Sequence, residues 1–244
     1  MHVCRRRNVR SLRSFTPSWS TQGRPAKLTS NSPPPDSRLI MSRIATDGVL
    51  VQFDSVKLVS STMSRGNLLF LLSGSIACYK ACTVISRLAQ AGVTVQTVAT
   101  PAALRFVGAA TLEGLSGRPV FTDVFESGRA LDHIELARAA DMALVCPATA
   151  NTINRLAGGL ADDPIGTLFL AWEMKTKPWW LAPAMNGYMW NHPATARSLE
   201  QLRNWGVRVL DPVDGAHACG ESGPGRLVEP EQIAAEVLTA LSKK

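Results

Sequence analysis

Short apolar runs alternate with helical patterns through most of the chain after residue 62. Runs that are apolar, or that alternate with a period of two, predict strands at 68–72, 93–99, 142–146, 179–182 and 207–210. The 3.6-residue spacing of apolar positions predicts helices at 151–173, 194–205, 230–242 and over a stretch that includes Ile76, Tyr79, Val84, Ile85 and Leu88 and ends at Gly92. Pro101 is expected to open a further helix. Strands that alternate with helices are typical of an α/β fold whose parallel sheet is covered on both faces.

Small and polar residues cluster directly after the predicted strands. Residues 73–75 follow the first strand, Thr100 follows the second, 147–152 follow the third and 183–186 follow the fourth. In open parallel sheets, ligands bind at the carboxyl ends of the strands. The sequence therefore predicts one ligand site formed by these four segments.

Two of these segments suit an anionic or flat ligand. The 73–75 turn leads into a helix N-terminus, whose N–H groups and hydroxyls would bind a phosphate, although such turns are also small and polar for steric reasons alone. The 147–152 segment combines small residues with the polar side chains of Thr149, Asn151 and Thr152. The same segment would equally serve as a capped helix start, with Thr149 or Asn151 as the N-cap.

His133 and Asn186 are candidates for proton transfer and carboxylate binding. Asp132 is predicted to cap a helix and Glu135 to complete a capping box, which would place His133 in the first turn. There the helix dipole disfavours imidazolium, as a general base requires, although many histidines at helix starts merely face solvent. The amide of Asn186, at the end of a buried strand, could bind a carboxylate without carrying charge, or it could form an Asx turn.

A glycine-rich segment at 218–226 carries Cys219 and Arg226. Glycines at this density are typical of a mobile flap. A cysteine on an exposed flap is a poor core residue, which favours a chemical role for Cys219.

The basic charge of the chain is confined to its first part. The 244 residues carry 26 Lys and Arg against 19 Asp and Glu, a formal net charge of +7. Ten basic and three acidic residues fall within 1–62 and account for the whole excess, whereas 63–244 carry 16 of each. We therefore expect neither a nucleic acid nor a membrane as the partner of the folded part, although the total charge alone would favour one.

The segment 1–62 is predicted to be a basic, mostly disordered leader, and 63–244 to form one domain. The leader is rich in Arg, Ser and Pro and has no acidic residue before Asp36, a composition shared with organelle transit peptides. A translation start at Met41 or Met63 would explain it equally. Five widely spaced cysteines indicate a reducing compartment, so we expect a cytoplasmic protein, or an imported one if the leader is a transit peptide. The four isolated histidines predict no metal site.

Five motifs, in the same order, resemble those of the homo-oligomeric flavin-containing cysteine decarboxylases. They are SGSIACYK at 73–80, DHIELAR at 132–138, PATANT at 147–152, PAMNGYMW at 183–190 and ACGESGPGR at 218–226. The resemblance covers about residues 66–242. It implies a Rossmann-like, flavodoxin-type three-layer sandwich, assembled as trimers or multiples of trimers, with FMN near the subunit interface.

The resemblance also implies roles for individual residues. Those expected to bind FMN are Gly74, Ser75, Thr100, Thr149, Ala150, Asn151, Thr152 and Ala184. Those expected around a phosphorylated substrate are Asn186, Met189, Ala218 and Arg226. His133 is implied as the catalytic base, Asn186 as the ligand of the substrate carboxylate and Cys219 as the proton donor. For the substrate phosphate, Arg226, Lys80 and an arginine of a neighbouring subunit are alternatives.

The reaction implied by the resemblance is decarboxylation of 4′-phosphopantothenoylcysteine to 4′-phosphopantetheine in coenzyme A biosynthesis. FMN would oxidise the thiol-bearing carbon, which provides an acceptor for the electrons that carbon dioxide leaves behind. A separate phosphopantothenoylcysteine synthetase is then expected to supply the substrate. The alternatives are a peptidyl-cysteine decarboxylase, a flavin prenyltransferase, which lacks the cysteine flap, and a non-catalytic regulatory paralogue, which would not need His133, Asn186 and Cys219 together.

Overall fold

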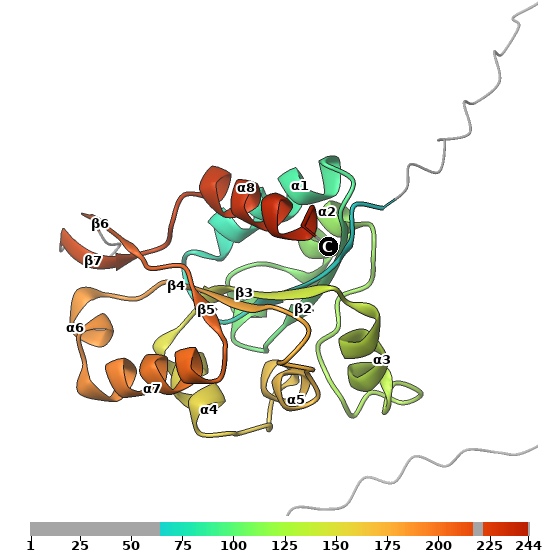
Figure 1. Ribbon diagram of the computed structural model, residues 1–244. Helices are drawn as coiled ribbons and strands as arrows, with labels where there is room; N and C mark the ends of the chain where they lie inside the picture. The colour runs from blue at the N-terminus through green and yellow to red at the C-terminus, as the bar shows by residue number, and fades with distance from the viewer. Residues whose placement is uncertain (1–63, 217–221, 244) are drawn as a thin grey trace, which may run out of the picture. The chain divides into compact units, whose positions relative to one another are not determined.

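Five parallel strands form the central sheet of the computed structural model, which describes residues 64–216 and 222–243 (Figure 1). The strands are β1 (Asn67–Leu72), β2 (Thr94–Ala99), β3 (Met142–Ala148), β4 (Trp179–Pro183) and β5 (Arg208–Val209). Their spatial order is β2-β1-β3-β4-β5, the order of flavodoxin-type folds, in which the chain reverses direction across the sheet between β1 and β3. The predicted α/β fold with a parallel sheet is confirmed.

Helices cover both faces of the sheet and complete three layers (Figure 1). One face carries α1 (Cys78–Gln90), α2 (Ala109–Ser116) and α8 (Pro230–Leu241). The other face carries α3 (Asp132–Ala139), α4 (Ala150–Ala157), α5 (Pro164–Leu170) and α7 (Pro193–Asn204). The last helix has the predicted apolar stripe, since Ile233, Val237 and Leu241 are all buried.

Alternation along β1 divides the core into two halves. Leu68, Phe70 and Leu72 pack in the core under α1 and α8, whereas Leu69 and Leu71 pack in the core on the opposite face. Successive side chains of a strand point to opposite faces, so a strand buried on both sides must be apolar throughout. The continuous run Leu68–Leu72 therefore marks a central strand of this sheet.

The helix expected at 151–173 is two helices, and that expectation is corrected. Helix α4 ends at Ala157, and Gly159 then adopts φ +66°, a left-handed conformation that terminates the helix. Helix α5 begins at Pro164 with Asp163 as its N-cap. The Gly-Gly pair and the Asp-Pro pair thus act as stop and start signals inside one apolar pattern.

Two smaller expectations are also corrected. Helix α1 begins at Cys78, so Ile76 precedes it, and the side chains of Ile76 and Tyr79 are 59% and 64% exposed instead of buried. Pro101 is followed by a single 3₁₀ turn, η1 (Ala103–Arg105), and the α-helix on that side starts at Ala109. A pattern of apolar residues therefore predicted these helices but not their first turns.

The chain after β5 adds a small antiparallel hairpin, β6 (Val213–Ala216) and β7 (Ser222–Arg226). The short helix α6 (Gly187–Trp190) lies close to it (Figure 1). Part of the segment predicted to be a flap is therefore a strand. The predicted leader, Ala218 and Cys219 lie outside the described residues.

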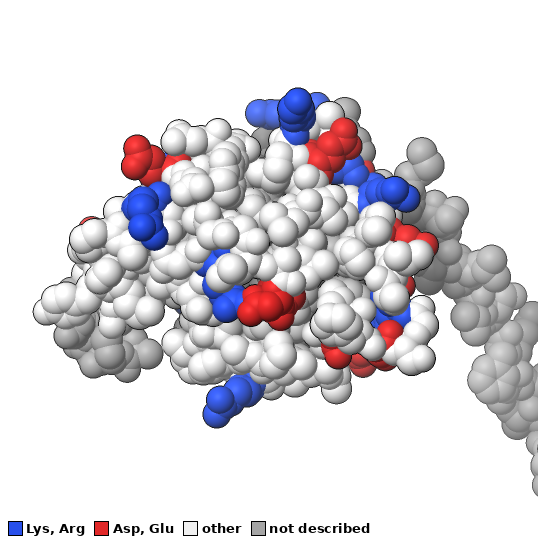
Figure 2. Space-filling view, turned by 90° about the horizontal axis from the view of Figure 1, so that it is seen from below, with Lys and Arg blue, Asp and Glu red and all other residues white. Residues whose placement is uncertain are grey.

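Acidic and basic side chains are intermixed on the face that carries α3, α4, α5 and α7, with wide uncharged areas between them (Figure 2). The described residues form no single-sign patch on this face, in keeping with the balanced charge of 63–244. Within the described part of the chain, no helix has both the length and the apolar character that crossing a membrane requires.

Candidate functional site

A cavity of about 630 Å³ lies at the carboxyl ends of the sheet strands, where the sequence placed the ligand site. Its predicted lining residues are Gly74, Ser75, Thr100, Thr149, Ala150, Asn151, Thr152, Ala184 and Met189. The structure thus brings together all eight residues expected to contact a cofactor, from four separate segments. Cavities of this size accommodate cofactors and drug-sized ligands.

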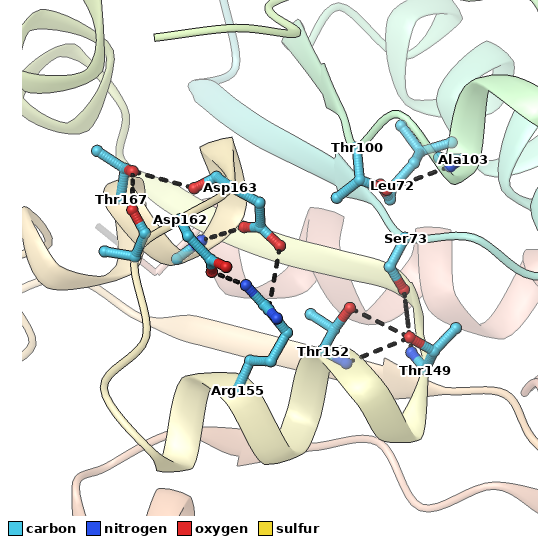
Figure 3. A network of polar contacts seen from close by, with 12 residues as sticks. Leu72, Ser73, Thr100, Ala103, Thr149, Thr152, Arg155, Asp162, Asp163 and Thr167 are labelled. Atoms are coloured by element: carbon cyan, nitrogen blue, oxygen red, sulfur yellow. Dashed lines mark hydrogen bonds and ion pairs between the residues drawn. The ribbon is translucent and has the colours of Figure 1, made fainter.

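Ser73 ties the ends of β1 and β3 together beside this cavity (Figure 3). Its hydroxyl donates to the carbonyl of Pro147 at 2.7 Å and accepts from the N–H of Thr149 at 3.0 Å. Thr149 caps α4, because its Oγ1 accepts from the N–H of Thr152 at 3.3 Å. The buried polar side chains at the strand ends are therefore paired with one another, which fixes the start of α4 against the sheet.

The cavity wall on the other side of β1 is shaped by a glycine. A Cβ added at Gly74 would lie 2.6 Å from Cβ of Ala102, so only glycine fits this contact. Thr100 holds the neighbouring turn, since its Oγ1 accepts from the N–H of Ala103 at 3.1 Å. The wall therefore consists of closely packed backbone at Gly74, hydroxyl groups and the start of α4. The first N–H groups of that helix have no acceptor within the helix. Such a surface can bind an anion without a charged side chain.

Asn186 follows β4 and caps α6, as the Asx-turn interpretation predicted. Its Oδ1 accepts from the N–H of Met189 at 2.9 Å. Its Nδ2 has no hydrogen-bond acceptor among the described residues, so no described group competes with a ligand for this donor. Asn186 itself does not line the cavity, although Met185 and Met189 on either side of it do.

The β6–β7 hairpin is anchored to the same segment through Gly225. The carbonyl of Gly225 accepts from the N–H of Met185 at 2.9 Å. Gly225 has φ +120°, and a Cβ there would lie 2.3 Å from the carbonyl oxygen of Met185. This position therefore requires glycine for both its conformation and its contact.

Replacement of Gly225 by alanine is expected to destabilise the protein by about 1–3 kcal/mol, because alanine must either strain its backbone or separate the hairpin from β4. Urea unfolding and the Tm measure this loss. Gly223→Ala is the matched control in the same strand, since a Cβ there meets no atom within 4 Å. Equal stability of the two variants would show that the Gly225 contact does not hold the hairpin.

Arg226 and Lys80, the two cations of this chain considered for a substrate phosphate, both bind Glu229. Lys80 Nζ lies 3.2 Å from Oε2 of Glu229, and Arg226 forms a close ion pair with Oε1. Neither residue lines the cavity. The structure joins the end of β7 to α1 and α8 through this shared carboxylate and does not bring either cation to the cavity.

His133 lies in the first turn of α3, as predicted, but its helix is not capped as expected. The N-cap position is Leu131, with no side-chain capping bond, and Asp132 instead accepts from Arg129 Nε at 2.7 Å. This hydrogen bond raises the pKa of Arg129 above its usual range. Nδ1 of His133 is buried without a hydrogen-bond partner among the described residues, and His133 does not line the cavity.

The carboxyl end of α3 is held by Lys177. Its Nζ donates to the carbonyl of Ala137 at 3.0 Å and to that of Arg138 at 2.6 Å. The same ammonium lies 5.5 Å from the ring centroid of Trp172, which packs against Trp179 in the core. Arg129 and Lys177 thus fix the two ends of the short helix that presents His133.

Four lining residues lie outside the segments predicted from the sequence: Pro101, Ala102, Arg155 and Asp163, whereas Met185 belongs to the predicted 183–186 segment. Arg155 follows Thr152 by three residues on α4, so helical spacing alone would have placed both on one side of the helix. Asp163 lies close to Arg155 only because the chain turns back between α4 and α5. No local signal in the sequence indicates that turn-back contact.

Among the described cysteines, Cys78 and Cys146 are unsuited to nucleophilic chemistry. Burial raises the pKa of the thiols of Cys78 and Cys146, and the Cys78 Sγ donates to the carbonyl of Ser73 at 3.3 Å. Together with Cys82 they are free thiols. Within residues 64–216 and 222–243, no group of three or more His, Cys, Asp or Glu side chains could hold a metal ion.

A family model described as Flavoprotein matches residues 57–242 of the chain. The coenzyme A biosynthesis bifunctional protein CoaBC of Bacillus subtilis is 44% identical over 173 residues, which cover 70% of this chain and 42% of that protein. The chain therefore matches less than half the length of that curated relative.

Solved structures of similar proteins cover the same part of the chain. A cysteine-to-serine variant of a PPC decarboxylase, complexed with pantothenoylaminoethenethiol, is 32% identical with a TM-score of 0.64, covering 72% of this chain and 97% of that one. The FMN-dependent cysteine decarboxylase SpaF is 30% identical with a TM-score of 0.62, covering 74% of this chain and 99% of that one.

Proposed function

This chain belongs to the flavoprotein family, and from that membership we propose that it catalyses the FMN-dependent decarboxylation of 4′-phosphopantothenoylcysteine to 4′-phosphopantetheine in coenzyme A biosynthesis. One observation carries the proposal: all eight residues expected to contact FMN line one cavity. The choice of substrate follows from relatives that are named for coenzyme A biosynthesis and for PPC decarboxylase.

The cavity fits FMN in its chemistry. Ser75, Thr100 and the start of α4 offer hydroxyls and N–H groups for a phosphate, while Ala184 and Met189 offer apolar contact for a flat ring. When bound, FMN would accept two electrons from the thiol-bearing carbon of the substrate and return them after carbon dioxide has left, so the reaction has no net redox change.

Three side chains would do the remaining work. His133 would remove a proton as the substrate is oxidised, since histidine is the side chain that most often acts as a general base. Asn186 would orient the substrate carboxylate through Nδ2, because its Oδ1 is occupied by the N–H of Met189. Cys219 would return a proton to the decarboxylated product. The cysteine-to-serine relative that holds an ethenethiol compound supports this last role.

Asn186→Asp is expected to lower kcat/KM about a hundredfold, because a second carboxylate repels that of the substrate. Asp and Asn are equivalent N-caps, so the Tm should stay close to that of the wild type. Steady-state assays and thermal unfolding measure the two effects separately. Asn191→Asp, at the exposed C-cap of α6, is the control. Full activity of Asn186→Asp would show that Asn186 does not bind the substrate carboxylate.

A homo-oligomer, which we take to be a trimer or a multiple of trimers, would complete the site. His133 does not line the cavity of its own chain, so an adjacent subunit would supply it. Exposed apolar side chains offer surface for such contacts, including Ile76 and Tyr79 near the cavity wall and Phe125 and Leu131 before α3. We place this assembly in the cytoplasm, where free thiols persist, with a separate synthetase as the source of substrate.

A peptidyl-cysteine decarboxylase is the second candidate function, because SpaF is named as an FMN-dependent cysteine decarboxylase without reference to coenzyme A biosynthesis. The two functions share the chemistry and differ in what precedes the terminal cysteine. Purified protein should be yellow and should release carbon dioxide from 4′-phosphopantothenoylcysteine in preference to a peptide that ends in cysteine. A colourless protein that cannot be reconstituted with FMN would overturn both functions, whereas preference for the peptide would select the second.

A further inference from the structure

Arg155 and Asp163 bring charge to a cavity wall that is otherwise uncharged. They are the two charged residues among those that the described chain contributes to the lining. Arg155 extends from α4 and Asp163 caps α5, so the two helices present them side by side (Figure 3). No role in cofactor or substrate binding follows for this pair from the motifs that identify the family.

The pair is held in a fixed geometry. Arg155 Nε lies 3.7 Å from Oδ2 of Asp163, and Nη2 forms a close ion pair with Asp162. Oδ1 of Asp163 accepts from the N–H of Gly166 at 2.8 Å. A Cβ at Gly166 would lie 2.2 Å from the carbonyl oxygen of Leu160, so the turn between α4 and α5 is closely packed on α5. A guanidinium fixed in this way loses little conformational entropy when it binds a ligand.

The local charge argues against a phosphate at this end of the cavity. One guanidinium faces the carboxylates of Asp162 and Asp163, which leaves the cluster negative, and Asp163 is only 20% exposed in its side chain. A phosphate suits the opposite side, where Ser75, Thr100 and the start of α4 provide donors without carboxylates. Figure 3 shows Thr100 and Thr149 on one side and the arginine cluster on the other.

We propose that Arg155 and Asp163 bind the pyrimidine edge of the FMN isoalloxazine ring, with the guanidinium donating to a ring carbonyl and the carboxylate accepting from the ring N3–H. The assignment rests on the proposed function. That edge presents a donor between two acceptors, and the pair offers the complementary donor and acceptor. It also places FMN with its phosphate toward Ser75 and Thr100. The positive charge of Arg155 favours electron density on the ring, so bound FMN should have a higher reduction potential with this guanidinium than without it.

Flavin binding tests the proposal without any assay of activity. The probes are FMN, riboflavin and 3-methylriboflavin, with each Kd measured by flavin fluorescence quenching. Arg155→Gln should bind both FMN and riboflavin at least about tenfold more weakly, because a charged hydrogen bond to the ring is lost from both. The reduction potential of FMN bound to this variant should fall. Arg203→Gln, which breaks the exposed pair between Arg203 and Asp211, is the matched control and should change neither value.

The N3–H contact has its own comparison. Wild-type protein should bind 3-methylriboflavin more weakly than riboflavin, and Asp163→Asn should bind the two alike. Asparagine keeps the N-cap of α5, so this variant should fold. If Arg155→Gln fails to fold, Arg155→Lys serves for the same measurements, since lysine keeps the charge and loses the fork of donors.

The outcomes separate this assignment from the proposed function. Weakened FMN binding with unchanged riboflavin binding would make Arg155 a phosphate ligand and overturn the assignment. If Arg155→Gln binds both flavins as tightly as the wild type, the cluster only holds α4 and α5 together and does not contact FMN. If the wild-type protein binds neither FMN nor riboflavin, both the proposed function and this assignment are overturned. If the wild type binds both flavins tightly and Arg155→Gln has the same Kd values, only the assignment is overturned.

Discussion

His133→Asn is expected to lower kcat for decarboxylation by about 10²–10⁴-fold, the contribution typical of a general base. Asparagine has a similar polar end but does not accept a proton near neutral pH. His133 is presented by a helix fixed at both ends by Arg129 and Lys177, so the variant should fold and should bind FMN as tightly as the wild type. Stopped-flow measurement of flavin bleaching on mixing with substrate isolates the affected step.

His192→Asn is the matched control for this experiment. His192 caps α7 through Nδ1, which accepts from the N–H of Ala194 at 3.1 Å, and asparagine is a good N-cap. Its activity should match that of the wild type. Bleaching of His133→Asn at the wild-type rate would exclude His133 as the base.

Mixed oligomers test which chain supplies His133. Co-expressed His133→Asn and Asn186→Asp subunits should recover activity in about a quarter of the sites if each site combines the cavity of one subunit with the histidine of its neighbour. Neither variant alone should show this recovery. Absence of recovery in verified mixed oligomers would place both residues of each site in one chain.

Cys219→Ser is expected to release one equivalent of carbon dioxide per site and then stop, with the yellow absorbance of the flavin lost and an ethenethiol held in the site. A serine hydroxyl is a far weaker acid than a thiol, whose pKa is about 8.5, so the proton for the last step is missing. The relative that carries a cysteine-to-serine change and holds pantothenoylaminoethenethiol is consistent with such a stall.

Cys82→Ser is the matched control. Cys82 is half-buried on α1 and does not line the cavity, so steady turnover should persist. Mass spectrometry of the small molecule released on denaturation identifies the bound product. Repeated turnover by Cys219→Ser would leave Cys219 without an essential role.

The sheet and the ligand site could be predicted from the sequence because their signals are local. The run Leu68–Leu72 indicates a strand buried on both faces, and alternation with helices indicates a parallel sheet. The carboxyl ends of parallel strands lie at one edge, so the polar residues after each strand had to meet. All eight residues expected around the cofactor do line the cavity.

Other features depend on contacts between segments that no local pattern reveals. The break between α4 and α5 depends on Gly159 and Asp163, whose effects oppose a continuous apolar pattern. The capping box expected at Asp132 is absent because Arg129 takes the carboxylate. In each case, a tertiary partner or a backbone conformation outweighs the intrinsic preference of the residue.

The sequence by itself determined the succession of strands and helices along the chain, the edge where ligands bind and the balanced charge of residues 63–244. Only the tertiary structure decided which charged side chains line the cavity at that edge. Lys80 and Arg226 carry the same charge as Arg155, yet they share Glu229 and do not line the cavity, whereas Arg155 lines it beside Asp163. The physical reason is that apolar periodicity depends on near neighbours in the chain, whereas the pairing of charges depends on distances that only the folded backbone sets.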